Sequence, residues 1–566
     1  MVIFDDSQQS GCAICLAPGA SAPERFAAEE LRRYLSAATS GNFPILDSLA
    51  PDQIGFLVGD LGRSLVEPLP DLSEDGYVMR RVGDQIVLLG GSPRATLYAV
   101  YHFLERYLGF RWLEPGDDAV PSLSKISLEN LDDLEEPAYT FRSVVNFPFT
   151  VERMLKESDW MAKNRLNWTH PGINHPHVWA ECRGAETVMP DITKRGLRML
   201  WGGHTFQTWI PTDVYFETNP EFFGLVNGER IPQQNFRGSL CLSNPQLQRE
   251  VAKNILRFAA ENPDIDIVDI WMNDTVDWCE CENCEKTDGD PDYIQHPEIF
   301  SLEGKPQKSR AYFTFVNNVA RMVGKENPNL RLSPLAYART FEPPTNLKVE
   351  SNVIVGYTNF TRSTINSLLD DSLADEGSKL NVIYVETIRR WQNHADPENL
   401  FIYEYYDYPD TFNPFSELRT NVVQMAEELK WYPKVGILQM SSEGAGEFYW
   451  RPMVMYVYAH LVWNPEQSYE DLMKDFCDHA YGDVAGQMLK FWKIQELRHP
   501  HITQRDKNLK ILEEIKGMTG DPTVIARLEH LEELVSRPDH ITKWPDESEQ
   551  PKDQGPGGLV GFADAS

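Results

Sequence analysis

The feature that most constrains the fold is the order of apolar runs between residues 139 and 443. Eight short runs, each suited to a buried strand, alternate there with amphipathic helical segments such as PQLQREVAKNILRFAAEN. This alternation is typical of a parallel sheet whose strands are joined by helices. The predicted strands are 139–146, 166–170, 198–204, 267–273, 331–338, 353–359, 400–407 and 435–443. Eight β/α units in order predict an α/β fold of the (β/α)8 TIM-barrel type, not a doubly wound sheet.

The rest of the chain supplies further domains. A chain of 566 residues is too long for one hydrophobic core, because domains rarely grow beyond about 250–300 residues. Strand-like runs and a helix opened by Ser92 and Pro93, a favoured N-cap and first helical residue, precede the barrel. We therefore predict a small α+β domain at 1–135, the barrel at 136–450, a helical C-terminal region at 451–540 and a flexible polar tail at 541–566.

Charge and hydropathy limit the partners. The net charge is −32, whereas nucleic acids and anionic membranes select basic surfaces, so we expect neither as a partner. No apolar stretch reaches the roughly 20 residues that span a bilayer. The start, MVIFDDSQQSG, lacks the basic and apolar regions of a signal peptide, so we expect a cytoplasmic location unless a leader has been removed. The oligomeric state is left open.

Carboxylates follow several predicted strands, and the carboxyl ends of barrel strands form the active face of such folds. Asp274 follows the fourth strand, Glu404 lies in the seventh and Glu443 closes the eighth. Glycoside hydrolysis needs one protonated acid at the leaving oxygen and one ionised partner, and we predict these three residues as catalytic. Glu404 stands among tyrosines, an apolar setting suited to an acid. The alternative is that some of the three cap helices or pair with arginines.

Aromatic, amide and histidine side chains accompany these carboxylates, as a sugar site requires, because flat rings stack on pyranose faces. The four histidines His170, His175, His177 and His204 could bind sugar hydroxyls, a carboxylate or a metal. His170 and His204 end strands, so we expect both to contact substrate, while His175 or His177 fits structural hydrogen bonding. The full set predicted to bind substrate is His170, His204, Trp271, Asn273, Tyr357, Asn359, Tyr406 and Arg142.

Three cysteines lie within six residues in the segment WCECENCEK. The spacing of Cys279, Cys281 and Cys284 suits a structural zinc ion, with Cys241, Cys182 or a histidine as fourth ligand. The alternative is a reduced or partly disulfide-bonded loop. Catalysis itself is expected to need no cofactor. Such clustering is unlike a disulfide scaffold and favours a reducing compartment.

Several segments resemble known families. Residues 90–121, GGSPRATLYAVYHFLERYLGFRWLEPGDDAVP, resemble the end of the non-catalytic N-terminal domain of bacterial α-glucuronidases and β-hexosaminidases. HTFQTWIPTDVYFETNPEFFGLVNGER, SLCLSNP and WMNDTVDWCECENC resemble the bacterial domain-of-unknown-function family 4838, whose members pair such a domain with a barrel. The resemblance implies glycoside hydrolysis by kinship. It also implies an acid after strand four and carboxylates closing later strands, as Asp274, Glu404 and Glu443 are placed, although Asn273-Asp274 stands where hexosaminidases have Asp-Glu.

Together these features predict a glycoside hydrolase acting on a terminal sugar, acidic or N-acetylated, of an oligosaccharide or glycoside. The main alternative is a non-catalytic glycan-binding protein on a hydrolase-like barrel. A metal-assisted enzyme such as a polysaccharide lyase is a third class, although no zinc-hydrolase pattern such as HExxH appears. The sugar, the linkage and the stereochemical outcome are left open.

Overall fold

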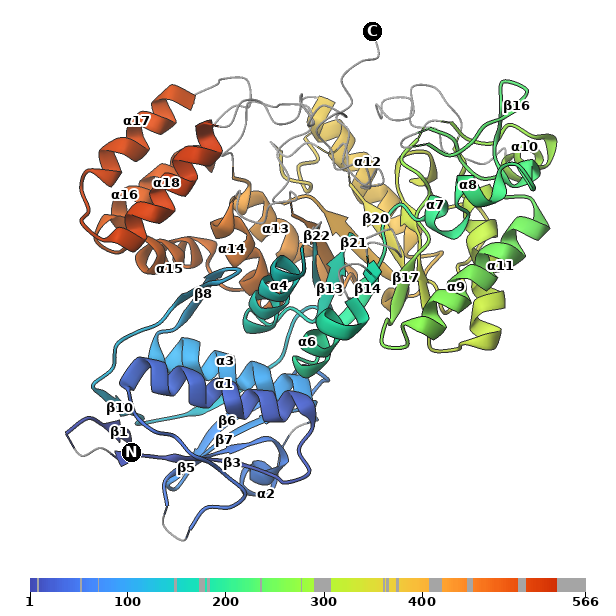
Figure 1. The fold of residues 1–566 in the computed structure, drawn as a ribbon. Helices are drawn as coiled ribbons and strands as arrows, with labels where there is room; N and C mark the ends of the chain where they lie inside the picture. The colour runs from blue at the N-terminus through green and yellow to red at the C-terminus, as the bar shows by residue number, and fades with distance from the viewer. Residues whose placement is uncertain are drawn as a thin grey trace.

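The computed structural model describes most of the chain in three parts, which Figure 1 shows as a ribbon. The described residues are 1–7, 10–50, 53–69, 71–146, 150–172, 179–180, 184–234, 237–275, 277–289, 307–359, 362, 366–372, 376–406, 420–444, 451–496 and 505–536. The predicted tail at 541–566 lies outside them, as do His175, His177 and Cys182.

A parallel barrel occupies the centre, and the predicted (β/α)8 fold is confirmed. Each of the eight predicted strands overlaps an observed strand, and all neighbours pair in parallel. The strands are β12 (Phe141–Asn146), β13 (Trp168–Pro171), β14 (Arg198–Trp201), β17 (Ile267–Asp269), β18 (Arg331–Ser333), β19 (Leu335–Ala336), β20 (Val355–Thr358), β21 (Leu400–Glu404) and β22 (Gln439–Glu443). The helices between them include α4 (Val151–Lys163), α6 (Met189–Lys194), α9 (Pro245–Glu261), α10 (Glu282–Asp288), α11 (Ser309–Glu326), α12 (Glu376–Trp391) and α13 (Val422–Trp431).

The fifth predicted strand is divided into β18 and β19 at Pro334. Proline has no N–H to donate, so it interrupts a strand ladder. β18 pairs with β17, and β19 pairs with β20. The two halves of this strand are therefore the first and last strands of the nine-stranded sheet. A bridge between Leu332 and Val353 closes the ring, and Gly356 N–H donates to Pro334 O at 2.9 Å. The barrel therefore closes around a broken strand.

The first domain is a six-stranded sheet covered by two helices. In spatial order the strands are β11 (Asp132–Glu135), β6 (Tyr77–Val82), β7 (Gln85–Gly90), β5 (Gly55–Val58), β3 (Ala13–Leu16) and β4 (Ile45–Leu46). Helices α1 (Ala22–Thr39) and α3 (Pro93–Leu108) lie between this sheet and the rest of the molecule (Figure 1). Ser21 and Glu24 form a capping box on α1, and Ser92 caps α3 through the N–H of Ala95.

A buried carboxylate joins the first domain to the barrel. Asp75 precedes β6 and accepts hydrogen bonds from Arg94 Nε, Arg142 Nη2 and Asn167 Nδ2, each at 2.8 Å. Burial raises the pKa of Asp75, but Arg142 and Arg94 outweigh it and hold that pKa below its ordinary value. Because Arg142 lies in β12, the link is made to the barrel's first strand.

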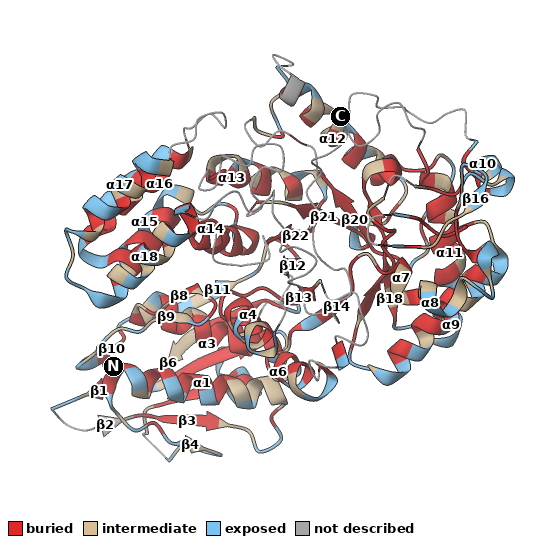
Figure 2. Cartoon of the chain, turned by 45° about the horizontal axis from the view of Figure 1, so that its top comes forward, coloured by how far each residue is buried: buried red, intermediate tan, exposed pale blue. Residues whose placement is uncertain are grey.

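The C-terminal region is helical, as predicted, and packs against both other parts. It comprises α14 (Pro452–Trp463), α15 (Tyr469–Tyr481), α16 (Ala485–Glu496), α17 (Arg505–Lys516) and α18 (Pro522–Ser536). All of α14 is buried, as Figure 2 shows. Arg111, in β8 (Arg111–Glu114) of the first domain, binds Asp475 of α15 through two hydrogen bonds of 2.6 and 2.8 Å. Among all the residues that the structure describes, no helix has both the length and the apolar character that a bilayer crossing requires.

Candidate active site

Three rings line the barrel interior near the carboxyl ends of its strands. Trp271, just after β17, meets Tyr403 of β21 edge-on, with ring centroids 5.6 Å apart. The His170 ring of β13 lies 5.3 Å from the same indole. All three are buried, and they come from strands on different sides of the barrel. They therefore form the aromatic floor of the strand-end face, with Glu443 directly beside it.

Glu443, the last residue of β22, has the features of a general acid. The Tyr403 hydroxyl donates to its Oε2 at 2.5 Å, and only 5% of the residue is exposed. Burial disfavours the carboxylate and, with the negative charge of Asp274, raises the pKa of Glu443 to about 7. The carboxyl group thus keeps its proton up to a pH of about 7, as a proton donor must.

Asp274 is the second carboxylate of this face. It follows Asn273 after β17 and is half-buried, and the Tyr337 hydroxyl donates to its Oδ1 at 3.3 Å. Burial raises the pKa of Tyr337 well above its ordinary value, and the charges of Asp274 and Glu443 raise it further. The two carboxylates and this hydroxyl thus lie close enough to influence one another. The structure brings together two of the three predicted catalytic residues.

Glu404 lies in different surroundings, and the expected apolar setting is wrong. Neighbouring residues of a strand point to opposite faces of the sheet. Tyr403 points into the barrel, so Glu404 points towards the surrounding helices. Its carboxylate accepts from Arg362 Nε at 3.1 Å, from Asn359 Nδ2 at 2.7 Å and from Tyr432 Oη at 3.0 Å. Glu404 is therefore held in a buried ion pair.

The same arginine connects Glu404 to a second buried carboxylate. Arg362 donates to both oxygens of Glu428 at 2.9 and 3.0 Å, and the Tyr406 hydroxyl donates to Glu428 at 2.9 Å. Two of the predicted substrate contacts, Asn359 and Tyr406, thus belong to this network. Arg362 and Glu428 were not predicted as site residues, because they lie outside the predicted strand ends.

One ring of the floor, His170, belongs to a buried histidine–aspartate pair. His170 Nε2 is 2.8 Å from Asp269 Oδ2, and neither side chain is exposed. Burial raises the pKa of Asp269, although His170 opposes the shift. Asp269 was missed, but a lone acid inside the apolar run IVDIWM, on the same strand face as Trp271, could have revealed it.

The remaining predicted substrate contacts have varied positions. His204 lies beside Trp271, with ring centroids 5.7 Å apart, and its Nδ1 is 2.5 Å from Met272 O. The Asn273 amide donates to Gln233 at 2.7 Å and to Gly238 O at 3.0 Å, so it holds the neighbouring loop.

Two of the predicted contacts lie away from this face. Tyr357 donates to Tyr384 O of α12 at 3.1 Å, so its hydroxyl faces the helical layer. Arg142 is fully buried against the first domain through Asp75. The rule that strand-end residues face the substrate fails for both, because Tyr357 points outward and Arg142 lies near the start of its strand.

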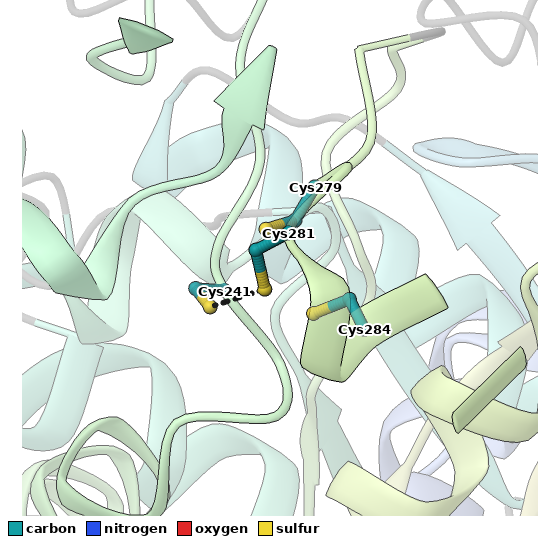
Figure 3. Close-up of side chains that lie close together, drawn as sticks. All are labelled: Cys241, Cys279, Cys281 and Cys284. Carbon is teal, nitrogen blue, oxygen red and sulfur yellow. Dashed lines mark hydrogen bonds between the residues drawn. The ribbon is translucent and has the colours of Figure 1, made fainter. Parts of the chain in front are cut away.

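The three predicted metal ligands lie together, and a fourth cysteine joins them (Figure 3). The sulfur atoms of Cys241, Cys279, Cys281 and Cys284 all lie within 4.8 Å of one another. Cys241 is one of the residues predicted as a possible fourth ligand, and the structure places it in this cluster.

The architecture of the chain is shared with glycoside hydrolases. One solved structure, "A novel family GH115 4-O-Methyl-alpha-glucuronidase, BtGH115A, with specificity for decorated arabinogalactans", matches with a TM-score of 0.58 and 11% identity, over 93% of this chain and 71% of that one. Another, "Structure of CpGH84D", matches with a TM-score of 0.51 and 9% identity, over 93% of this chain and 84% of that one. At these identities the likeness concerns the fold.

The family follows from the sequence match. Residues 112–493 match the family described as "Domain of unknown function (DUF4838)", and the chain belongs to it. No curated protein matches the chain. The predicted resemblance to this family is confirmed.

Proposed function

We propose that this protein is a glycoside hydrolase that removes a terminal sugar, with Glu443 as general acid and Asp274 as its ionised partner. The observation that carries the proposal is the buried Glu443, whose pKa of about 7 lies well above that of an ordinary glutamate, next to a second carboxylate at the barrel's strand ends. Two carboxyl groups in unlike environments provide the acid and the ionised group that glycoside hydrolysis needs.

The surrounding groups fit these roles. Glu443 protonates the departing glycosidic oxygen, and Asp274 acts on the anomeric carbon, either directly or through a water molecule. Tyr403 and Tyr337 each donate a hydrogen bond to one of the two carboxylates and so orient them. Glu404 has no direct part in this scheme, because its carboxylate is held by Arg362, Asn359 and Tyr432 on the helical side of β21.

Two buried polar atoms of the floor support a polar ligand at this face. His170 Nδ1 and Trp271 Nε1 have no hydrogen-bond partner among the described residues. Buried polar atoms rarely stay unpaired, so each suits a sugar hydroxyl or carboxylate. The α-glucuronidase of similar fold acts on an acidic sugar according to its name, which makes glucuronides the first substrates to test.

The test is a screen of aryl glycosides, including glucuronides, galacturonides and N-acetylhexosaminides, followed by Glu443→Gln and Asp274→Asn on any substrate that is cleaved. On a cleaved substrate whose leaving group is unactivated, we expect each substitution to lower kcat by about 10²–10⁴-fold, the usual contribution of a positioned acid or base. Undiminished turnover in both variants would overturn the assignment. Sugar binding without turnover in the parent protein would instead establish the glycan-binding alternative.

A further inference from the structure

Four cysteines from two separate segments converge beside the loop that carries Asp274. Cys241 follows the hairpin of β15 (Leu225–Val226) and β16 (Glu229–Arg230), whereas Cys279 lies in the loop after β17. Cys281 is the N-cap of α10, and Cys284 lies in that helix. Figure 3 shows Cys241 on one segment of the chain and the other three cysteines on another. The cluster therefore spans two neighbouring strand-end loops of the barrel.

The spacing of the sulfur atoms fits a tetrahedral metal. Zinc–thiolate bonds of about 2.3 Å place the sulfur atoms of a tetrahedron roughly 3.8 Å apart. Cys241 and Cys281 are 3.6 Å apart at sulfur, and all four sulfur atoms lie within 4.8 Å of one another. Three of the four residues are buried and Cys281 is half-buried, so the set is complete and largely closed to water. A closed set of four protein ligands is typical of a structural site.

Hydrogen-bond donors surround the sulfur atoms, as they do around metal-bound thiolates. The Leu225 N–H donates to Cys279 Sγ at 3.4 Å, and Arg230 Nη1 donates to the same sulfur at 3.8 Å. Ser243 Oγ lies 3.1 Å from Cys284 Sγ. The arginine also offsets part of the negative charge of four thiolates around one divalent ion.

The cluster lies next to the hydrogen bonds that hold the loop of Asp274. Asn273 binds Gly238 O at 3.0 Å, and the Gly238 N–H binds the Asp277 carboxylate at 3.4 Å. The cysteines continue this connection, with Cys241 on the Gly238 side and Cys279 on the Asp277 side. A metal ion here would tie the two loops together on the C-terminal side of Asp274.

We propose that Cys241, Cys279, Cys281 and Cys284 bind one structural Zn²⁺, and that this ion fastens the segment after the β15–β16 hairpin to the loop that carries Asp274. The ion provides folding free energy and takes no part in bond cleavage, because all four coordination positions belong to the protein. The site does not depend on the proposed hydrolase activity, and its test uses metal content.

The experiment measures zinc in the full chain, purified without chelators, by inductively coupled plasma mass spectrometry. We expect about one zinc ion per chain. Replacement by Co²⁺ should give the intense visible bands and sulfur-to-metal charge transfer of a tetrahedral thiolate site. Cys284→Ser should lose the metal, whereas Cys477→Ser, at a buried cysteine of α15, should retain it.

The zinc content of the parent chain tests the proposal even if Cys284→Ser does not fold. A chain without zinc whose thiols give no cobalt spectrum would overturn the proposal. Mass-spectrometric mapping of Cys241 or Cys279 to a disulfide would overturn it as well. Arg230→Ala gives a finer check, because the loss of a donor to a metal-bound thiolate should weaken zinc affinity about 10–100-fold.

Discussion

At the scale of single residues, Glu443 predicts the pH dependence of catalysis. Because its acid form is the active one and its pKa is about 7, we expect kcat/KM to fall about tenfold per pH unit above that value. A pH–rate profile on an unactivated substrate measures this limb. On a substrate with an activated leaving group, Glu443→Gln should keep most of its activity while Asp274→Asn does not. Equal losses in the two variants would contradict the division of roles.

The burial that raises the pKa of Glu443 also lowers the stability of the protein once this carboxyl group ionises. A folded-state pKa of about 7, against an ordinary 4.5, means that the native protein holds the proton more tightly than the unfolded chain. Stability therefore falls as the pH rises from about 4.5 to 7, by on the order of 3 kcal/mol in all. Glutamine carries no such charge, so Glu443→Gln should unfold at a higher temperature than the parent at pH 8 and at a similar one at pH 4. Calorimetry at the two pH values checks this.

Replacing Glu404 should lower the stability of the protein at neutral pH, in contrast to the gain expected from replacing Glu443 at high pH. Glu404→Gln removes the charge paired with Arg362, which then keeps only Glu428 as an ionic partner in the described structure. We expect a loss of about 2 kcal/mol of stability at neutral pH, as for a hydrogen bond between charged groups. Urea unfolding measures it, and a variant as stable as the parent would show that the pair is energetically neutral.

The residues that sequence could identify were those whose position along a strand determines their surroundings. Asp274 follows one strand and Glu443 ends another, so barrel topology alone predicts that both lie on the same face. Glu404 could not be placed, because its neighbour Tyr403 faces inward and its partner Arg362 follows a different strand. Partners distant in sequence become visible only when the helical layer is in place.

At the scale of elements, the loop after β17 is the part whose order should depend on metal. If zinc is stripped with a thiol-reactive agent and a chelator, we expect faster hydrogen exchange in 222–243 and 277–289, and a fall in kcat larger than any change in KM. The reason is that Asn273 and Asp277 connect this loop to the segment ending at Cys241. Exchange that rises evenly over the whole chain would instead indicate general unfolding.

The strands themselves were predictable because buried parallel strands have continuous apolar sequences. The break at Pro334 is the exception: the apolar pattern continues through the proline while the hydrogen-bond ladder does not. The hairpin of β15 and β16 was missed for a related reason, since each strand has only two residues and no periodicity to detect.

At the scale of the whole molecule, Asp75 holds the first domain to the barrel. Asp75→Asn removes the charge that both Arg94 and Arg142 face in the interior. Loss of one partner from a buried ion pair typically costs about 3–5 kcal/mol, so we expect a large fall in the free energy of unfolding. Asp84→Asn, at an exposed aspartate of the same domain, is the matched control and should change little. Chemical denaturation of both variants tests this, and equal midpoints would contradict it.

The position of Asp75 also bears on how such chains are inherited. Arg142 and Asn167, in and between the barrel's first two strands, depend on a carboxylate encoded 67 and 92 positions upstream. A recombination event at the boundary between the domains would leave a guanidinium in the barrel without its counter-ion. The two domains are therefore expected to evolve as one unit, and a foreign N-terminal domain can replace this one only if it brings an acidic residue to the same place.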